Sequence, residues 1–205
     1  MAKKRLSALE RKELILSKVK ELCTKNGFAG TTLDEIARSA GVSRALVIQL
    51  FGNKENLYKE LLNNIFKDHP MEKDPNILHH AEKNDDLGVF LAFAEHIYNN
   101  MALENSSSPL RLLMFIMLEK PDIYRDHFQN RRLKGIKILE EYLIKGIREK
   151  RFKQINVHHI SICFSAMIIY VILEKITLQG TLSKEEFIDI IKTTASSILN
   201  GIKRR

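Results

Sequence analysis

Arg44 and Gln49 are the polar members of a short segment that also carries Ala45, Leu46 and Ile48. An arginine can donate two hydrogen bonds to guanine, a glutamine can pair with adenine, and an alanine methyl can contact the methyl group of thymine. Leu46 and Ile48 offer apolar surface only. Side chains of these types, gathered between positions 44 and 49, predict contacts with the edges of DNA bases.

Two further residues of the same region are suited to phosphate. Thr32 and Lys54 stand at predicted helix starts, where exposed N–H groups and the positive end of a helix attract anions. Residues 1–60 carry twelve Lys and Arg against seven Asp and Glu, whereas the rest of the chain carries twenty-one against eighteen. A basic arm at residues 3–5 could lie along phosphates or form a solvated tail. The positive charge is concentrated where a polyanion would bind, with a solvated basic surface as the alternative.

Residues 32–51 predict two short helices joined by a tight turn. Thr32 can accept a backbone N–H of the first turn while Glu35 reaches back to the N–H of Thr32, which makes a capping box. Gly41 stands where the chain must turn sharply, because glycine adopts the left-handed conformation without steric cost. Ser43 can cap the second helix.

The apolar residues of this segment predict how the two helices pack. On the first helix Ile36, Ala37 and Ala40 share one face, and Val42, Val47 and Leu50 are placed to meet them. A small residue at Ala37, followed four positions later by Gly41, fits a close helix-turn-helix crossing. An ordinary corner between two helices of another all-helical protein is the alternative.

A longer series of residues follows a fixed order: Ile15, Val19, Leu22, Gly27-Phe28, Thr31-Thr32, Ile36-Ala37, Ala40-Gly41-Val42-Ser43, Phe51, Lys54-Glu55 and Leu57. Over about residues 8–62, this order resembles the DNA-binding domain of the TetR (tetracycline-repressor-like) family of bacterial transcriptional regulators. The resemblance implies an all-α fold with an N-terminal three-helix helix-turn-helix DNA-binding domain (residues 1–53). A C-terminal helical ligand-binding and dimerisation domain (residues 54–205) would follow. It also implies a homodimer on double-stranded DNA with a palindromic operator.

The second helix of the motif departs from the family pattern. TetR-like proteins usually carry a small polar residue at the position of Leu46, a tyrosine at Ile48, a histidine or tyrosine at Gln49 and an aromatic residue at Leu50. Three interpretations remain open. The protein anchors itself through basic residues, or Leu46 and Ile48 contact thymine methyls, or specific DNA binding is weak or lost.

Beyond the motif, the pattern predicts helices at residues 54–66, 85–104, 110–118, 122–150, 157–178 and 184–203, with a domain boundary or a loop-rich connection at 67–84. The helix at 110–118 is nearly all apolar and should be buried on most sides. Residues 162–173 are apolar all round and must be covered on two opposite sides. A second copy of the chain would supply one cover in a four-helix bundle, with a large monomeric core as the alternative.

Aromatic and methionine side chains of the C-terminal part could line an apolar pocket between helices, although such residues also fill ordinary cores. The candidates for binding a small apolar ligand are Phe90, Phe93, Met101, Met114, Phe115, Tyr124, Phe128, Met167 and Tyr170. His96 and His127 are the candidate polar groups of such a pocket, with an ordinary core or surface histidine as the more common alternative.

Other classes of function find little support in the sequence. It contains no phosphate-binding glycine loop, nucleophile elbow or zinc-binding histidine pair. We therefore expect no catalytic residues, no cofactor and no metal, with His79 and His80 at the surface. Cys23 and Cys163 lie far apart, which is typical of a reduced cytoplasmic chain. Cys163 is expected as a small buried residue, with a redox switch as the alternative.

The longest apolar run, residues 162–173, falls short of the roughly 20 residues that span a bilayer, so no membrane segment is expected. The sequence thus predicts a dimeric transcriptional regulator, a repressor that a small apolar ligand releases from its operator. One alternative is a dimeric helical sensor or partner-binding protein whose N-terminal domain has lost specific DNA binding. A helical enzyme that uses an apolar cavity is a third hypothesis.

Overall fold

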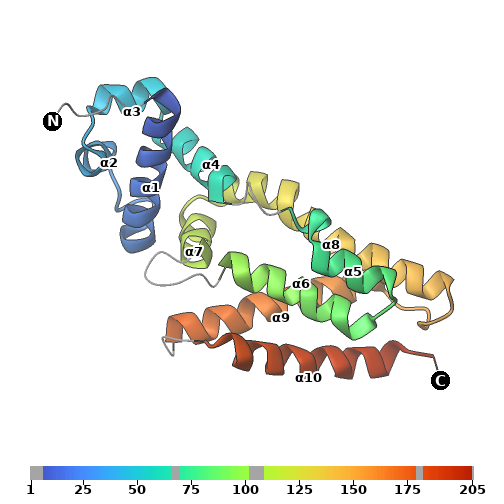
Figure 1. The fold of residues 1–205 in the computed structure, drawn as a ribbon. Helices are drawn as coiled ribbons and strands as arrows, with labels where there is room; N and C mark the ends of the chain where they lie inside the picture. The colour runs from blue at the N-terminus through green and yellow to red at the C-terminus, as the bar shows by residue number, and fades with distance from the viewer. Residues whose placement is uncertain (1–6, 66–69, 102–108, 179–181, 205) are drawn as a thin grey trace. The chain divides into compact units, whose positions relative to one another are not determined.

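The computed structural model describes residues 7–65, 70–101, 109–178 and 182–204, apart from the side chains of residues 127–134 and 175–178. These residues form α1 (Ala8–Asn26), α2 (Leu33–Ala40), α3 (Arg44–Phe51), α4 (Lys54–Ile65), the 3-10 helix η1 (Met71–Lys73), α5 (Pro75–Glu82), α6 (Asp86–Met101), α7 (Pro109–Glu119), α8 (Pro121–Arg148), α9 (Val157–Leu178) and α10 (Lys184–Ile202) (Figure 1). Within the described ranges there is no β-sheet, only an isolated bridge between Phe152 and Lys203. The predicted all-α fold is confirmed.

The chain divides into two compact units. Unit 1 comprises Met1–Asp68 and Glu104–His127, and unit 2 comprises His69–Leu103 and Phe128–Arg205. Packing therefore groups α4, α7 and the start of α8 with the helix-turn-helix. The division of function after residue 53 stays a prediction, because a packing boundary does not say which residues bind DNA.

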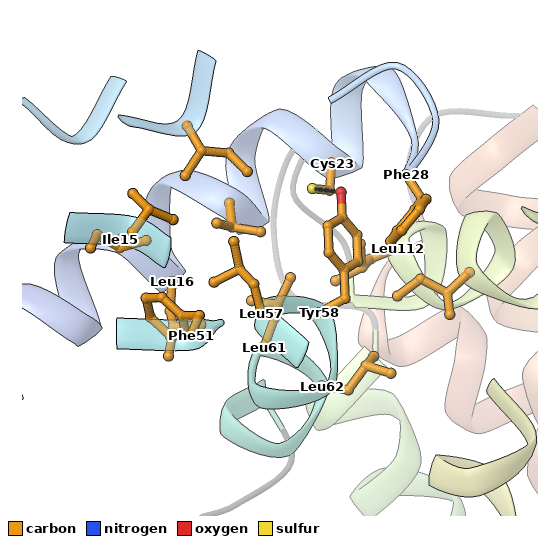
Figure 2. Packing of buried hydrophobic residues seen from close by; sticks show 14 of the residues in the cluster. Ile15, Leu16, Cys23, Phe28, Phe51, Leu57, Tyr58, Leu61, Leu62 and Leu112 are labelled. Atoms are coloured by element: carbon orange, nitrogen blue, oxygen red, sulfur yellow. Dashed lines mark hydrogen bonds between the residues drawn. The ribbon is translucent and has the colours of Figure 1, made fainter. Parts of the chain in front are cut away.

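Unit 1 is built around the buried face of α1, which starts at a capping box between Ser7 and Glu10. Ile15, Val19 and Cys23 of this face are fully buried. Figure 2 shows Tyr58 of α4 pointing toward Cys23, with a hydrogen bond between the phenol oxygen and Sγ. Burial raises the pKa of the Cys23 thiol and, together with the nearby Cys23, that of the Tyr58 phenol. Both groups are held neutral inside the core.

α7 is less buried than its sequence predicts. Leu112 and Ile116 enter the unit 1 core, but Leu118 is 73% exposed and Arg111 is exposed as well. Leu110 is buried as well, and residues 113–115 and 117 are partly buried, so the prediction of burial on most sides is confirmed only in part. In unit 1, α7 packs against α1.

The predicted loop at residues 67–84 is also wrong in part, because it contains η1 and α5. Asp74 caps α5 by accepting the N–H groups of Asn76 and Ile77, and Pro75 occupies the first helical position. Proline is favoured there, since its missing N–H would have no partner in the helix and its φ already fits. A proline that looks like a helix breaker is here the start of a helix.

In unit 2, α6 packs against α5, α9 and α10. Phe90 and Phe93 of α6 meet Phe164 of α9, with ring centroids 4.8 and 6.2 Å apart. At the start of α6, the buried Asp86 accepts a hydrogen bond of 2.7 Å from the Tyr142 hydroxyl. α6 thus lies among three other helices, and a charged group is held at its start.

Asp86 is also the centre of an ion-pair network. Arg151 contacts its Oδ1 atom, and the Lys203 ammonium lies 3.1 Å from its Oδ2 atom. Burial and the hydrogen bond to Asp86 raise the pKa of the Tyr142 phenol. The network joins the start of α6, the body of α8 and the segment after α10.

α9 leaves part of its apolar surface uncovered. Cys163 and Ala166 are exposed, and Tyr170 is 62% exposed. By length and composition alone, α9 is the one helix of the described chain that could cross a membrane. Its segment Val157–Glu174 has a mean hydropathy of 1.7, and 28% of the segment is buried. Cys163 is therefore not the buried residue that the sequence predicts, because it lies on a face of α9 that is exposed among the described residues.

Candidate nucleic-acid interface

The turn between α2 and α3 is set by local side-chain contacts. The N–H of Glu35 donates to Thr32 Oγ1 at 3.2 Å, and the N–H of Thr32 donates to Glu35 Oε2 at 2.8 Å. These bonds complete the predicted capping box, and the backbone N–H of Thr32 lowers the pKa of Glu35. Gly41 follows with φ 65° and ψ 33°, the left-handed conformation predicted for it. Ser43 then accepts the N–H of Leu46 at 3.2 Å and caps α3.

The packing between α2 and α3 also follows the prediction. Ile36, Ala37 and Ala40 of α2 are buried, as are Val47 and Phe51 of α3. Val42 and Leu50 pack against the same core but are only partly buried. The two helices therefore cross over small side chains, and α3 is held by one narrow stripe.

The opposite side of α3 faces solvent. Arg44, Ala45 and Gln49 are exposed, Ile48 is 42% exposed and Leu46 is partly buried. Successive residues of an α-helix are rotated by about 100°, so Ala45 and Gln49 lie at the centre of this face. All five predicted base contacts are thus accessible to some degree on α3, and none belongs to the unit 1 core.

Arg44 is held by an acidic neighbour on α2. Its Nη1 atom lies 3.1 Å from Asp34 Oδ2, and the two side chains are 57% and 58% exposed. An ion pair this exposed contributes little to stability. Its effect is to extend the guanidinium along the surface, from which it can exchange to a stronger bidentate partner such as guanine.

The two predicted phosphate contacts differ in their surroundings. Thr32 is exposed, but its hydroxyl already takes part in the capping box and donates to Glu35 Oε2 at 2.9 Å. Lys54 is partly buried, and its Nζ lies 4.3 Å from the centre of the Phe28 ring. Burial lowers the pKa of Lys54. Both side chains therefore already have partners. The backbone N–H groups at the starts of α2 and α4 are better placed to bind phosphate than these side chains are. The basic arm at residues 3–5 lies outside the described residues.

Sequence reasoning missed Glu119 at the end of α7 and the adjacent Lys120, which contact residues on either side of the helix-turn-helix. The N–H of Ala29, in the loop before α2, donates to Glu119 Oε2 at 2.7 Å. Lys120 Nζ lies 2.8 Å from Glu55 Oε1, and it is also 5.0 Å from the centre of the Phe28 ring. These contacts join residues far apart in the chain, so no local sequence pattern predicts them.

The predicted ligand-binding residues are divided between the two units. Phe90, Phe93, Met101, Met167 and Tyr170 belong to unit 2, whereas Met114, Phe115 and Tyr124 belong to unit 1. Phe90 and Phe93 are fully buried in the aromatic core of unit 2, and Tyr124 packs against the core of unit 1. Phe128 and His127 lie outside the residues whose side chains are described. No one unit holds the whole predicted set, so its role in ligand binding stays a prediction.

The histidines near α5 make pairs with carboxylates. His80 Nδ1 lies 2.9 Å from Asp85 Oδ2, and His96 Nδ1 lies 2.6 Å from Asp74 Oδ2. His79 is exposed and His80 partly so. Among the described residues, no three His, Cys, Asp or Glu side chains are grouped in a way that could hold a metal ion.

Comparison with known proteins connects this geometry to a family. The family model of the bacterial regulatory proteins of the tetR family matches residues 15–61. An uncharacterised HTH-type transcriptional regulator of Bacillus subtilis, YhgD, is 29% identical over 90 residues, which cover 42% of this chain and 47% of that protein. The chain thus matches about half the length of this curated relative.

Solved structures share the fold over nearly the whole chain. A TetR-family transcriptional regulator from Mesorhizobium loti has a TM-score of 0.74 at 15% identity, covering 98% of this chain and 100% of that one. HlyIIR, a hemolysin II transcriptional regulator, has a TM-score of 0.61 at 22% identity, covering 97% and 100%. At these identities the likeness shows the fold. Residues 15–61 are thus similar in sequence to the bacterial regulatory proteins of the tetR family, and the chain shares the fold of solved TetR-family regulators.

Proposed function

We propose that this protein is a homodimeric, sequence-specific DNA-binding transcriptional regulator. The observation that carries the proposal is the exposed face of α3, where Arg44, Ala45, Ile48 and Gln49 stand clear of the core while Val47 and Phe51 fix the helix from behind. A helix held in this way can enter the major groove and present these side chains to base edges. Phosphates on either side would meet the starts of α2 and α4.

The uncovered face of α9 supports a dimer. Cys163, Ala166 and Tyr170 present apolar or weakly polar surface to solvent on a helix that is apolar along most of its length. Exposed apolar surface of this extent marks an interaction site. A second copy of the chain, packed through α9 and α10 in a four-helix bundle, would cover it and pair two α3 helices for a palindromic operator. Such a regulator would work in the cytoplasm, where bacterial DNA lies, without a membrane.

We assign the response to a small apolar ligand bound in the C-terminal domain. Ser161 of α9 has a fully buried hydroxyl with no hydrogen-bond partner among the described residues, although such groups are normally paired. A ligand with one polar atom could satisfy it beside the candidate apolar residues of the same unit. Binding would favour a spacing of the two α3 helices that no longer matches the operator, so repression is released.

A selection of bound duplexes from a random DNA library tests this function, with the wild type compared with Arg44→Ala and Gln49→Ala at two salt concentrations. The proposal is supported if the wild type selects an inverted repeat and each variant loses the base preference at one position of that repeat. Lys73→Ala, which removes an exposed charge from η1, is the control and should select the wild-type sequence. Salt-sensitive binding without an enriched sequence would contradict it.

That last outcome would favour the second candidate, a dimeric sensor or partner-binding protein that has lost specific DNA binding. The observation behind this candidate is the exposed Ile48, which cannot bind phosphate. Sedimentation of Tyr170→Glu tests the dimer that both candidates share. We expect a monomer, whereas Leu78→Glu, which changes an exposed apolar residue of α5, should leave the dimer intact.

A further inference from the structure

The exposed face of α3 is unusually apolar for a surface that meets nucleic acid. Ile48 is one of the few large apolar side chains of the described chain that are more than 40% exposed. Leu46 is partly buried, yet neither residue belongs to the core cluster of unit 1 or to the side chains packed against it. Ile48 lies outside the core cluster and is a weaker helix former than alanine or leucine, so neither the core of unit 1 nor helix propensity accounts for it.

The arrangement of this face alternates apolar and polar groups. At about 100° per residue, Ala45 and Gln49 lie at its centre, Ile48 lies on the side of Arg44, and Leu46 lies on the other flank. Arg44 is drawn toward Asp34 of α2. Ile48 and Leu46 therefore lie on either side of the Gln49 amide. When Gln49 contacts the edge of one base, the adjacent bases of the DNA would lie against Ile48 or Leu46.

The major groove contains one apolar group that such side chains can meet. Guanine, adenine and cytosine present hydrogen-bonding atoms there, whereas thymine adds a methyl group at C5 beside its O4 acceptor. Pressing an isoleucine against an unpaired base donor or acceptor strips that atom of water without replacing the bond. Contact with a methyl group buries apolar surface on both partners instead. The same side chain thus selects for a methyl and against the other base edges.

Resting on the DNA-binding function proposed above, we infer that Ile48 and Leu46 are specificity-determining residues that bind the C5-methyl groups of pyrimidines. The preferred half-site carries a methylated pyrimidine at the positions that face these two side chains. Thymine and 5-methylcytosine both supply this group. Methylation of a cytosine in the operator would therefore alter the affinity of the regulator without any change in sequence.

The test starts from the duplex that the wild-type protein selects. Each thymine of one half-site is replaced by uracil, which removes the methyl group and leaves every hydrogen-bonding atom in place. At the positions facing Ile48 and Leu46, we expect affinity to fall about fourfold for each methyl lost. The same positions are then filled with cytosine and with 5-methylcytosine, where the methylated base should bind more tightly.

Variants of the protein connect each methyl to one side chain. Ile48→Ala should bind the thymine and uracil duplexes equally at one position, and Leu46→Ala should do so at another. Gln49→Ala is the matched control, because it weakens binding but should keep the full difference between thymine and uracil. If the methyl group raises affinity both for thymine over uracil and for 5-methylcytosine over cytosine, the residue recognises the methyl group itself. If it raises affinity for thymine alone, the inference is restricted to that base.

Two failures are distinguishable. An enriched operator that binds equally well with thymine and with uracil at every position overturns the inference and leaves the proposed function intact. A library without any enriched sequence overturns both, and the apolar face of α3 would then be a surface for another protein. A methyl effect that survives in Ile48→Ala and Leu46→Ala alike would also refute the assignment to these residues.

Discussion

The two units of this protein are stabilised in different ways. Unit 1 places short helices by contacts within a few residues: the capping boxes of α1 and α2, the left-handed Gly41 and the Ser43 cap. Unit 2 depends on partners far apart in the chain, such as Asp86 with Tyr142, Arg151 and Lys203. It also leaves an apolar face of α9 uncovered. The turns and helix starts of the helix-turn-helix are thus set by local contacts, whereas the Asp86 network of unit 2 joins distant parts of the chain.

This contrast explains why one region carries a family pattern and the other does not. A cap or a glycine with positive φ admits few residue types, so the same letters return in related chains. An aromatic core such as that of Phe90, Phe93 and Phe164 tolerates many substitutions that preserve its volume. The sequence of unit 2 can therefore drift while its helices stay in place.

The largest effect should come from breaking the Asp86 network. Asp86→Ala would remove the buried carboxylate that Tyr142, Arg151 and Lys203 share, leaving Arg151 only the more exposed Glu149 as a partner. We expect a loss of about 3 to 5 kcal/mol in the free energy of unfolding. Urea unfolding measures this loss as a lower midpoint. Glu82→Ala, an exposed carboxylate at the end of α5, is the control. A midpoint no lower than that of the control would show that unit 2 does not depend on this long-range contact.

Two isoleucines of unit 1 separate folding from recognition. Ile36 is fully buried, so Ile36→Ala should cost about 2 to 4 kcal/mol of stability through the cavity that it leaves. Ile48→Ala, at a 42% exposed position, should change stability by less than about 0.5 kcal/mol. Thermal unfolding and DNA titration of both variants check this, and equal losses of stability would mean that Ile48 supports the core after all.

A polar contact of unit 2 should depend on pH. Burial opposes ionisation of Asp74, but the hydrogen bonds with His96 and with the N–H groups of Asn76 and Ile77 outweigh it, so its pKa is lowered. Its stabilisation is therefore fully present above the unfolded pKa of about 3.9 and is lost as the pH falls through the lower folded value.

Asp74→Asn keeps the cap but loses the charge, so it should cost about 2 kcal/mol at neutral pH. The difference in unfolding free energy between wild type and variant should then shrink below about pH 4. Urea titrations from pH 7 to pH 2 measure it. A constant difference across that range would refute the assignment, and Glu72→Gln on η1 provides the baseline.

Two helix caps of the same kind, one in each unit, should have smaller effects on stability than the loss of Asp86, Ile36 or Asp74. Thr32→Ala and Ser183→Ala each remove a side-chain oxygen that caps a helix, at a cost of about 1 kcal/mol. Thermal unfolding should give similar shifts for both. Only Thr32→Ala should also weaken DNA binding, because only its helix start faces the proposed phosphate. Equal DNA affinities for the two variants would argue against that contact.

Sequence-based prediction succeeded for long helices with a continuous apolar face. The bounds of α9 match the prediction, and α10 starts as predicted and ends at Ile202, one residue before the predicted end. α5 was missed because a proline at the first position of a helix resembles one that breaks it. The burial of α7 and of Cys163 was overestimated, because apolar composition does not say whether a neighbour exists.

By itself, the sequence determined the all-helical class, the helix-turn-helix and which side chains of α3 face outward. Caps, turns and helical periodicity act within a few residues, so they can be recognised without the rest of the fold. Only the tertiary structure decided that α7 belongs to the unit of the helix-turn-helix, that Glu119 binds the N–H of Ala29, and that Asp86 has two cationic partners. These contacts join residues separated by tens of positions, and the chain must fold before their chemistry can be seen.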